Sequence, residues 1–251
     1  MKRFVVTLAL LLALAGCQAA TYRLPEVDGA QILAVAREMK ATGPVARRPE
    51  LPEWDARQRL RRGWDKVHAT AVEVCREMQR NSCRWWLDFN ESRGIQAWSK
   101  RGGRIEVQLG RADQSDGDDP VALTMAHEMA HKILDHSALR LPWLIRGWYL
   151  GNTAGRALGL LAAFGGYDLR PLVRLGRIHG LELGLRVLSR VHEREADYFA
   201  VLIAYRAGID LDGARADWAN ALRDRDHVHS TIVDTHPLGA ERIAQYDRAV
   251  A

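Results

Sequence analysis

The chain has 251 residues, of which 47% are hydrophobic and 27% are charged, a composition typical of a globular protein rather than of a disordered or fibrous one. At this length, one hydrophobic core with short appendages is the expected organisation. The net charge is +5, and Lys2 and Arg3 supply two of these charges. So small an excess, without a recognisable nucleic-acid-binding motif, argues against nucleic acid as a partner.

The first residues have the pattern of a secretory signal peptide. Lys2 and Arg3 precede a charge-free run over residues 4–14, which is too short to span a bilayer as a helix. The run ends in Leu-Ala-Gly-Cys, which resembles the lipoprotein box of bacteria, where cleavage before the cysteine leaves a lipidated first residue. We therefore predict a signal peptide over residues 1–16 and a lipid anchor on Cys17. An ordinary signal peptide, cleaved a few residues later, is the alternative.

Export determines how the next residues are interpreted. Gln18, rather than Asp, after the lipidated cysteine resembles lipoproteins sorted to the outer membrane, so we expect the mature chain to face the periplasm from that membrane. In this oxidising compartment Cys75 and Cys83 are expected to form a disulfide, with two separate thiols as the alternative. Residues 17–50, rich in Ala, Pro and charge, are predicted to be a tether with one short helix near residues 30–40.

One helix and three short strands are predicted after the tether. Apolar residues recur at near-helical spacing from Pro52 to Met78. Strands are predicted over residues 84–89, 95–99 and 104–109, with a hairpin turn at Gly102-Gly103. The third strand alternates polar and apolar residues, so one of its faces is expected to be solvated.

Helices are predicted to dominate the second half of the chain. An acidic loop over residues 113–119 ends in Asp119-Pro120, an N-cap followed by a first-turn residue, which predicts a helix from there to about His136. Further helices are predicted over residues 181–207, 212–222 and 237–250. Residues 141–166 are apolar and contain several glycines, and we interpret them as a packed helix or a lid, with contact with a membrane surface as the alternative.

The strongest chemical signal is the sequence His127-Glu128-Met129-Ala130-His131 within the helix after the acidic loop. Histidines four residues apart stand one turn above each other on one face of a helix, so both imidazoles can bind the same metal ion. Glu128 places a carboxylate beside that ion, where it can act on bound water. The surrounding residues are apolar, so these polar side chains are expected to be buried and to need a partner.

A catalytic zinc site usually has three protein ligands and one open position, so a third ligand is expected from another element. The sequence Glu193-Arg-Glu-Ala-Asp197 lies in the second long helix. Together the two motifs resemble zinc metallopeptidases of the HtpX, Oma and CAAX-prenyl-protease type, which combine His-Glu-x-x-His with a downstream Glu-x-x-Ala-Asp. The resemblance implies that His127, His131 and Glu193 bind the metal, that Glu128 is the general base, and that Asp197 orients a ligand histidine.

The resemblance extends to further histidines. The Thr-His-Pro-Leu segment around His236 is similar to a late segment of the family, which implies that His236 approaches the metal or a transition-state oxyanion; a histidine at a helix start is the alternative. His136 matches a histidine common in the family, although alone it is typical of a solvated helix end. Arg194 and Glu195 are interpreted as surface charges, and His192 as structural.

We therefore expect an α+β fold that is mainly helical, with a zincin-like metallopeptidase domain over residues 51–251 that has a small β-sheet and two metal-bearing helices. The resemblance implies one Zn²⁺ per chain and hydrolysis of peptide bonds in unfolded or misassembled envelope proteins. An exposed strand edge at residues 104–109 is expected to bind such extended polypeptides. The alternative is a latent or non-catalytic periplasmic chaperone or assembly factor with a zinc site.

Overall fold

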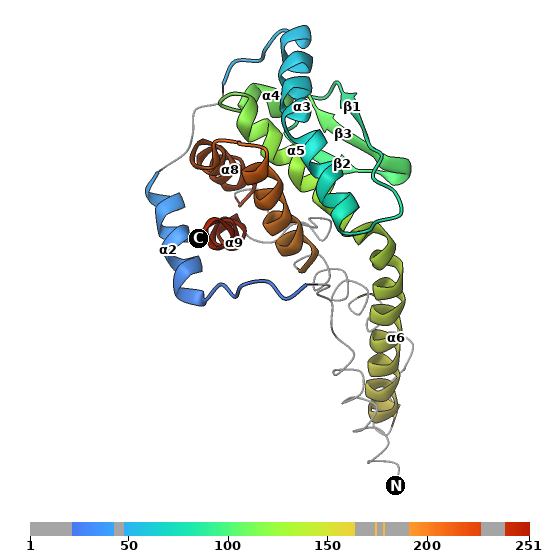
Figure 1. The fold of residues 1–251 in the computed structure, drawn as a ribbon. Coiled ribbons are helices and arrows are strands. Elements are labelled where there is room, and N and C mark those ends of the chain that lie inside the picture. The colour runs from blue at the N-terminus through green and yellow to red at the C-terminus, as the bar shows by residue number, and fades with distance from the viewer. Residues whose placement is uncertain (1–21, 43–47, 164–173, 175–177, 179–190, 227–238) are drawn as a thin grey trace.

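The computed structural model describes residues 22–42, 48–163, 174, 178, 191–226 and 239–251 (Figure 1). The predictions for the signal peptide, Cys17 and His236 fall outside these residues. In chain order the elements are α2 (Gly29–Ala41), α3 (Glu53–Glu77), β1 (Trp86–Asn90), β2 (Ala97–Ser99), the 3₁₀ turn η1 (Arg101–Gly103), β3 (Arg104–Gln108), α4 (Gly110–Gln114), α5 (Asp118–Ile133), α6 (His136–Ala163), a helix over residues 191–206, α8 (Leu211–Asp226) and α9 (Gly239–Val250).

Helix α5 is the element on which most of the others pack (Figure 1). Eleven of its 16 residues are buried. Helix α3 lies along it, strands β2 and β3 contact it, and α8 packs on it as well. Helix α9 then packs on α8, and α2 packs on α9. The structure is mainly helical with one small sheet, which confirms the predicted fold class.

The sheet has the strand order β1–β3–β2, with β1 parallel and β2 antiparallel to β3. The three predicted strands are confirmed, with boundaries that differ by at most two residues. The expectation that residues 104–109 offer an exposed edge is wrong, because β3 is the central strand and is paired on both sides. The edge strands are β1 and β2, and β2 lies against α5.

The predicted hairpin turn between β2 and β3 is confirmed. Gly102 has a φ of +75° and Gly103 a φ of +89°, backbone conformations that residues with a Cβ rarely adopt. A Cβ on Gly103 would also lie 2.4 Å from the carbonyl oxygen of Arg84. Glycine is therefore required here both by the backbone angle and by the close approach of the neighbouring chain.

Helix α5 begins two residues before the position predicted for it. Its N-cap is Gly117, with a φ of +107°, and Asp118 and Asp119 form its first turn. The expectation that Asp119 is the cap is therefore wrong. Both carboxylates lie at the positive end of the helix dipole and pair with α3. Arg62 Nε donates to Asp118 Oδ2 at 2.7 Å, and Lys66 pairs with Asp119.

The apolar segment after α5 forms most of α6, a helix of 28 residues that points away from the rest of the domain (Figure 1). Trp148 and Tyr149 on this helix are 40% and 64% exposed. Across the described ranges, none of the helices combines the length and the apolar character needed to cross a membrane. The interpretation of this segment as a lid or as a membrane contact stays a prediction.

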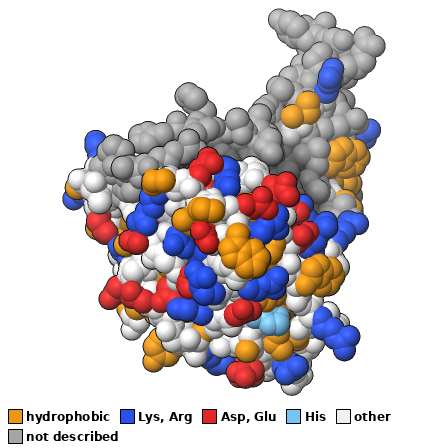
Figure 2. All heavy atoms as spheres, turned by 90° about the horizontal axis from the view of Figure 1, so that it is seen from above, with side chains coloured by type: hydrophobic (Ala, Val, Ile, Leu, Met, Phe, Trp, Pro, Cys, Tyr) orange, Lys and Arg blue, Asp and Glu red, His pale blue; other side chains and the backbone are white. Residues whose placement is uncertain are grey.

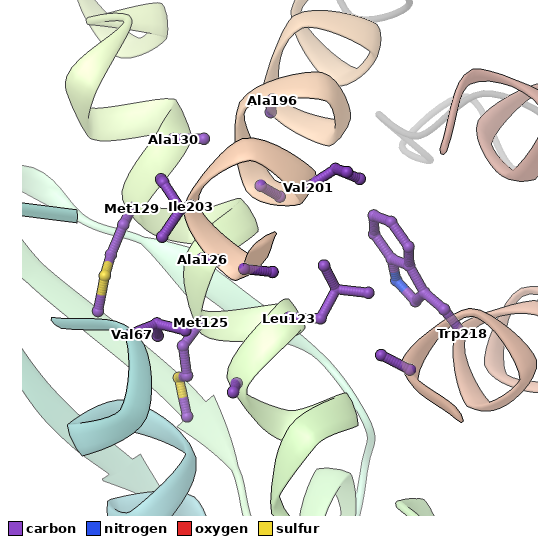
Figure 3. Close-up of a cluster of buried hydrophobic side chains, with 14 of the residues drawn as sticks. Val67, Leu123, Met125, Ala126, Met129, Ala130, Ala196, Val201, Ile203 and Trp218 are labelled. Atoms are coloured by element: carbon purple, nitrogen blue, oxygen red, sulfur yellow. The ribbon is translucent and has the colours of Figure 1, made fainter. Parts of the chain in front are cut away.

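The buried core lies on both sides of α5 (Figure 3). Met125 of α5 lies near Val67 of α3, and both are fully buried. Ala130 of α5 lies near Ala196 of the helix over residues 191–206. Trp218 of α8 belongs to the same cluster. This packing fixes the spacing between α5 and the helix over residues 191–206.

A helix packing and a disulfide hold two further segments of the chain in place. The short helix predicted near residues 30–40 is present as α2, whose Val35 and Met39 are buried and which packs against α9. Cys75, near the end of α3, is bonded to Cys83, with the two Cα atoms 5.8 Å apart. The disulfide therefore links the end of α3 to the segment that leads into β1.

Acidic and basic side chains are intermingled on the face that Figure 2 shows. Across the described residues, many charged side chains form ion pairs, such as Arg57 with Glu53 at 2.7 Å and Arg62 with Asp118 at 2.7 Å. On this face neither sign of charge gathers into a patch of its own.

Gly63 marks a close approach of α3 to α5. A Cβ on Gly63 would lie 2.5 Å from Val121 Cγ1 and 3.0 Å from the backbone nitrogen of Ala122. We expect Gly63→Ala to lower the free energy of unfolding by about 1–3 kcal/mol, because overpacking outweighs the helix propensity of alanine. Urea unfolding measures this difference. Gly29→Ala, with nothing within 4 Å of its Cβ, is the matched control, and a neutral or stabilising Gly63→Ala would contradict the close packing.

Candidate metal centre

Two neighbouring helices supply the residues of the predicted metal site. His127 and His131 lie one turn apart on α5, and Glu193 lies on the helix over residues 191–206. The side chains of His127 and Glu193 are 5% exposed, and that of His131 is 14% exposed. The two Nε2 atoms are 3.0 Å apart. Glu193 Oε2 lies 3.3 Å from His127 Nε2, and Glu193 Oε1 lies 3.3 Å from His131 Nε2.

These distances fit a bound zinc ion. Zinc bonds of about 2.0–2.1 Å at tetrahedral angles separate neighbouring ligand atoms by about 3.3 Å. Two imidazoles and one carboxylate are also the ligand set of several catalytic zinc sites, in which a fourth position is left for water. A cation at the centre would bind the lone pairs of the two imidazoles and would neutralise the charge of the buried carboxylate.

Glu128 lies beside this group of ligand atoms. It is 6% exposed and lines the same pocket as its neighbour His127. The other walls of the pocket come from the β2 region, α8 and α9, and include Ile95, Ala97 and Trp218. A carboxylate in this position can exchange a proton with a water molecule bound next to the metal ligands.

Asp197 lies one turn beyond Glu193 on the same helix and contacts His127. Its Oδ1 lies 2.9 Å from His127 Nδ1, so the Nδ1–H group donates to the carboxylate and Nε2 is the nitrogen that can bind a metal once it has lost its proton. Arg242 donates to both oxygens of Asp197, from Nε at 2.9 Å and from Nη2 at 2.7 Å. Burial opposes ionisation of Asp197, but the charge and hydrogen bonds of Arg242 outweigh burial and lower the pKa of Asp197 below its usual range.

The site favours positive charge between the ligands. Burial opposes protonation of His127, but its hydrogen bonds to Asp197 and Glu193 outweigh burial and raise its pKa to about 9. Arg242 supplies one buried positive charge against these two buried carboxylates, and its guanidinium lies 4.9 Å from the ring centre of Trp218. A divalent cation would complete the charge balance of this group.

A second buried cluster lies on the other side of His131. His136 Nδ1 is 2.8 Å from His131 Nδ1, and His136 Nε2 is 3.1 Å from Glu195 Oε2. His192 stacks on His136 with ring centres 4.0 Å apart and an angle of 5° between the planes. Glu195 is 0% and His136 is 5% exposed, so the interpretations of Glu195 as a surface charge and of His136 as a solvated residue are wrong.

Neither the pairing of Arg242 with Asp197 nor that of Glu195 with His136 was predicted from the sequence. A usable signal is the composition around Glu195. Ala196, Phe199 and Ala200 follow it, and all three are buried. Apolar residues on more than one face indicate a helix that is covered on several sides, where each charged side chain needs a partner.

A helix that carries His-Glu-x-x-His, packed against a second helix that carries a glutamate beside the two histidines, is the arrangement of a metal-dependent peptidase of the zincin type. The model of peptidase family M48 matches residues 63–250, and the chain belongs to this family. This membership confirms the family resemblance found in the sequence. It also implies zinc as the metal for the ligand group formed by His127, His131 and Glu193.

Two characterised relatives are similar to most of the domain. The mitochondrial metalloendopeptidase OMA1 of Schizosaccharomyces pombe is 25% identical over 190 residues, which cover 72% of this chain and 53% of the relative. The beta-barrel assembly-enhancing protease of Escherichia coli K12 is 26% identical over 153 residues, which cover 60% of this chain and 31% of the relative. The chain therefore spans about half of one relative and a third of the other.

The second cluster predicts a measurable sensitivity to acid. Burial, with a contribution from His131, lowers the pKa of His192 to about 4. Since the unfolded chain binds this proton near pH 6.5 and the folded chain only near pH 4, stability falls as the pH falls through this window. Between pH 7 and pH 5 this histidine is expected to cost about 1–2 kcal/mol of unfolding free energy.

His192→Phe keeps an aromatic ring against His136 and removes the titrating group. Its unfolding free energy should therefore fall less between pH 7 and pH 5 than that of the wild type, by the amount given above. Urea unfolding at both pH values, with a chelator present, measures the difference. Equal pH sensitivity of the two proteins would show that His192 does not resist protonation in the folded state.

Proposed function

We propose that this chain is a zinc metalloendopeptidase that is exported, anchored to the outer membrane through Cys17, and active on unfolded or misassembled envelope proteins. The observation that best supports peptidase activity is the convergence of His127, His131 and Glu193. The two Nε2 atoms lie 3.0 Å apart, and each lies 3.3 Å from one oxygen of the Glu193 carboxylate. Glu128 lies beside them in the same pocket as His127.

Zinc held by His127, His131 and Glu193 would polarise the scissile carbonyl and lower the pKa of a bound water. Glu128 accepts a proton from the attacking water and returns it to the nitrogen of the leaving amine. Asp197 keeps His127 in the tautomer whose Nε2 lone pair is free. His236 is proposed to assist, as the resemblance implies, by stabilising the transition-state oxyanion.

We propose that the substrate binds as an extended strand beside β2. This strand pairs with β3 on one side, through Ala97 and Val107, and is an edge of the sheet. Ile95 and Ala97 line the same pocket as Glu128, so a polypeptide added to β2 would pass close to the metal ligands. Binding of this kind uses main-chain hydrogen bonds and selects extended segments, which folded proteins seldom expose.

The envelope location is supported by the first residues of the chain and by one relative. The lipoprotein-like sequence at residues 14–17 predicts export and anchoring. The disulfide between Cys75 and Cys83 agrees with an oxidising compartment. The name of the E. coli relative describes a protease that enhances β-barrel assembly, and we propose a related quality-control role for this chain.

Glu128→Gln is expected to keep zinc and to lose hydrolysis by about 10²–10⁴-fold, because the amide cannot accept the proton of water. Purified residues 18–251 with zinc, incubated with an unfolded model protein such as casein, provide the assay. Glu91→Gln, a change of the same kind on a side chain that is 80% exposed, is the matched control and should cleave at the wild-type rate. Unchanged cleavage by Glu128→Gln would contradict its role as the base.

The same assay separates peptidase activity from the alternative of a latent or non-catalytic assembly factor. Such a protein would bind zinc without cleaving casein in either form. Glu193→Ala tests the ligand assignment independently, because it should lower bound zinc measured by atomic absorption. A full equivalent of zinc in that variant would exclude Glu193 as a ligand.

Lipidation of Cys17 is tested by mass spectrometry of the chain produced in a bacterial host. We expect the N-terminal peptide to begin at residue 17 and to carry acyl chains, because the preceding sequence resembles a lipoprotein box. Cys17→Ala should abolish the modification. An unmodified N-terminus at residue 20 or 21 in the wild type would indicate an ordinary signal peptide instead.

A further inference from the structure

His131 has two ring nitrogens, and only Nε2 faces the other metal ligands. The opposite nitrogen, Nδ1, lies 2.8 Å from His136 Nδ1, and His136 Nε2 lies 3.1 Å from Glu195 Oε2. We propose that His136 and Glu195 form an orienting pair that holds His131 in the tautomer needed to bind zinc. The proposal rests on the zinc-dependent function proposed above and assigns positioning roles to both residues.

The tautomers follow from the hydrogen bonds. For His131 to bind a metal through Nε2, its proton must be on Nδ1, which then donates to His136 Nδ1. His136 is left with its own proton on Nε2, and this group donates to Glu195. The reverse assignment would put a proton on His131 Nε2 and would place the His136 Nε2 lone pair against a carboxylate. One arrangement therefore satisfies every contact together with the metal.

Glu195 is itself held in place by a remote part of the chain. Its other oxygen, Oε1, accepts a hydrogen bond from the backbone nitrogen of Tyr22 at 2.7 Å. The Tyr22 ring packs edge-on against Phe199, with ring centres 5.2 Å apart. The carboxylate is 0% exposed, so these partners compensate the cost of burying it. Both oxygens of Glu195 are thus directed by donors from other elements.

His136, His192 and Glu195 also lie close enough together to be considered as a second metal site. The ring geometry argues against one. The two imidazoles stack with 5° between their planes and ring centres 4.0 Å apart. A metal binds an imidazole nitrogen along a lone pair in the plane of the ring. Two parallel, stacked rings cannot both direct such a lone pair at one ion, which favours the orienting role.

The central experiment measures zinc affinity by competition with a chelator. Glu195→Gln keeps the size of the side chain but offers one acceptor oxygen in place of two, and His136→Phe keeps the ring and removes both nitrogens. Each is expected to weaken zinc binding by about 10- to 100-fold. The double variant should be no weaker than His136→Phe alone, because the two residues act in series. Wild-type affinity in both single variants would overturn the proposal.

Two control variants distinguish an orienting pair from a second metal site and from a general effect of substitution. His192→Phe should keep wild-type affinity and a stoichiometry of one zinc; a second zinc in the wild type that is lost in this variant would show a metal site instead. Glu91→Gln, the same kind of change on an exposed side chain outside the site, should bind zinc as the wild type does and controls for a general effect of a Glu→Gln change. If the wild type itself binds no zinc, the proposed function fails, whereas normal binding by Glu195→Gln refutes only the orienting pair.

The tautomers can also be measured directly in the wild-type protein, so this test does not depend on whether a variant folds. Long-range ¹H–¹⁵N correlation spectra of the zinc-loaded protein report which ring nitrogen of each histidine carries the proton. We expect the proton on Nδ1 of His131 and on Nε2 of His136. A His136 proton on Nδ1, or a His131 without a proton on Nδ1, would overturn the proposal.

Discussion

Three carboxylates are buried on one helix, and each needs a hydrogen-bond donor or a positive charge that another part of the chain must supply. Glu193, Glu195 and Asp197 are 4%, 0% and 0% exposed. A buried negative charge is costly unless hydrogen bonds or positive charges compensate it. Each carboxylate is met by a different part of the chain: Glu193 by the histidines of α5, Asp197 by His127 and a guanidinium from α9, and Glu195 by α6 and the N-terminal segment. Elements far apart in the sequence must therefore come together before the helix can be buried.

The sequence was sufficient to predict the fold class, the three strands and the residues that converge at the metal centre. The histidines of α5 could be predicted because helical spacing and ligand chemistry constrain them locally, whereas Glu193 was predicted from the resemblance to a known family. The start of α5 was misplaced, since Gly117 and not an aspartate takes the cap position. The strand order was also missed, because pairing between strands is a long-range property that alternation within β3 does not encode.

The charged residues between and after the motifs were the hardest to interpret. Glu195 stands between Glu193 and Asp197 and was interpreted as a surface charge, yet it is fully buried. Its partners are His136, 59 positions away, and the backbone of Tyr22, 173 positions away. Separations of this size leave no local pattern. The apolar residues that follow Glu195 indicate a covered helix, but only the three-dimensional packing shows which partners meet its charge.

Each of the two motifs contains a buried alanine that cannot bind the metal. Ala130 lies between the histidine pair, and Ala196 lies between Glu193 and Asp197; both are 0% exposed and lie in the core where the two helices meet (Figure 3). Small side chains there allow two helix axes to approach closely, and that approach sets the reach required of each ligand. A larger residue at either alanine would widen the gap without touching a single ligand atom. The dimensions of the metal centre are thus fixed partly by methyl groups that take no part in its chemistry.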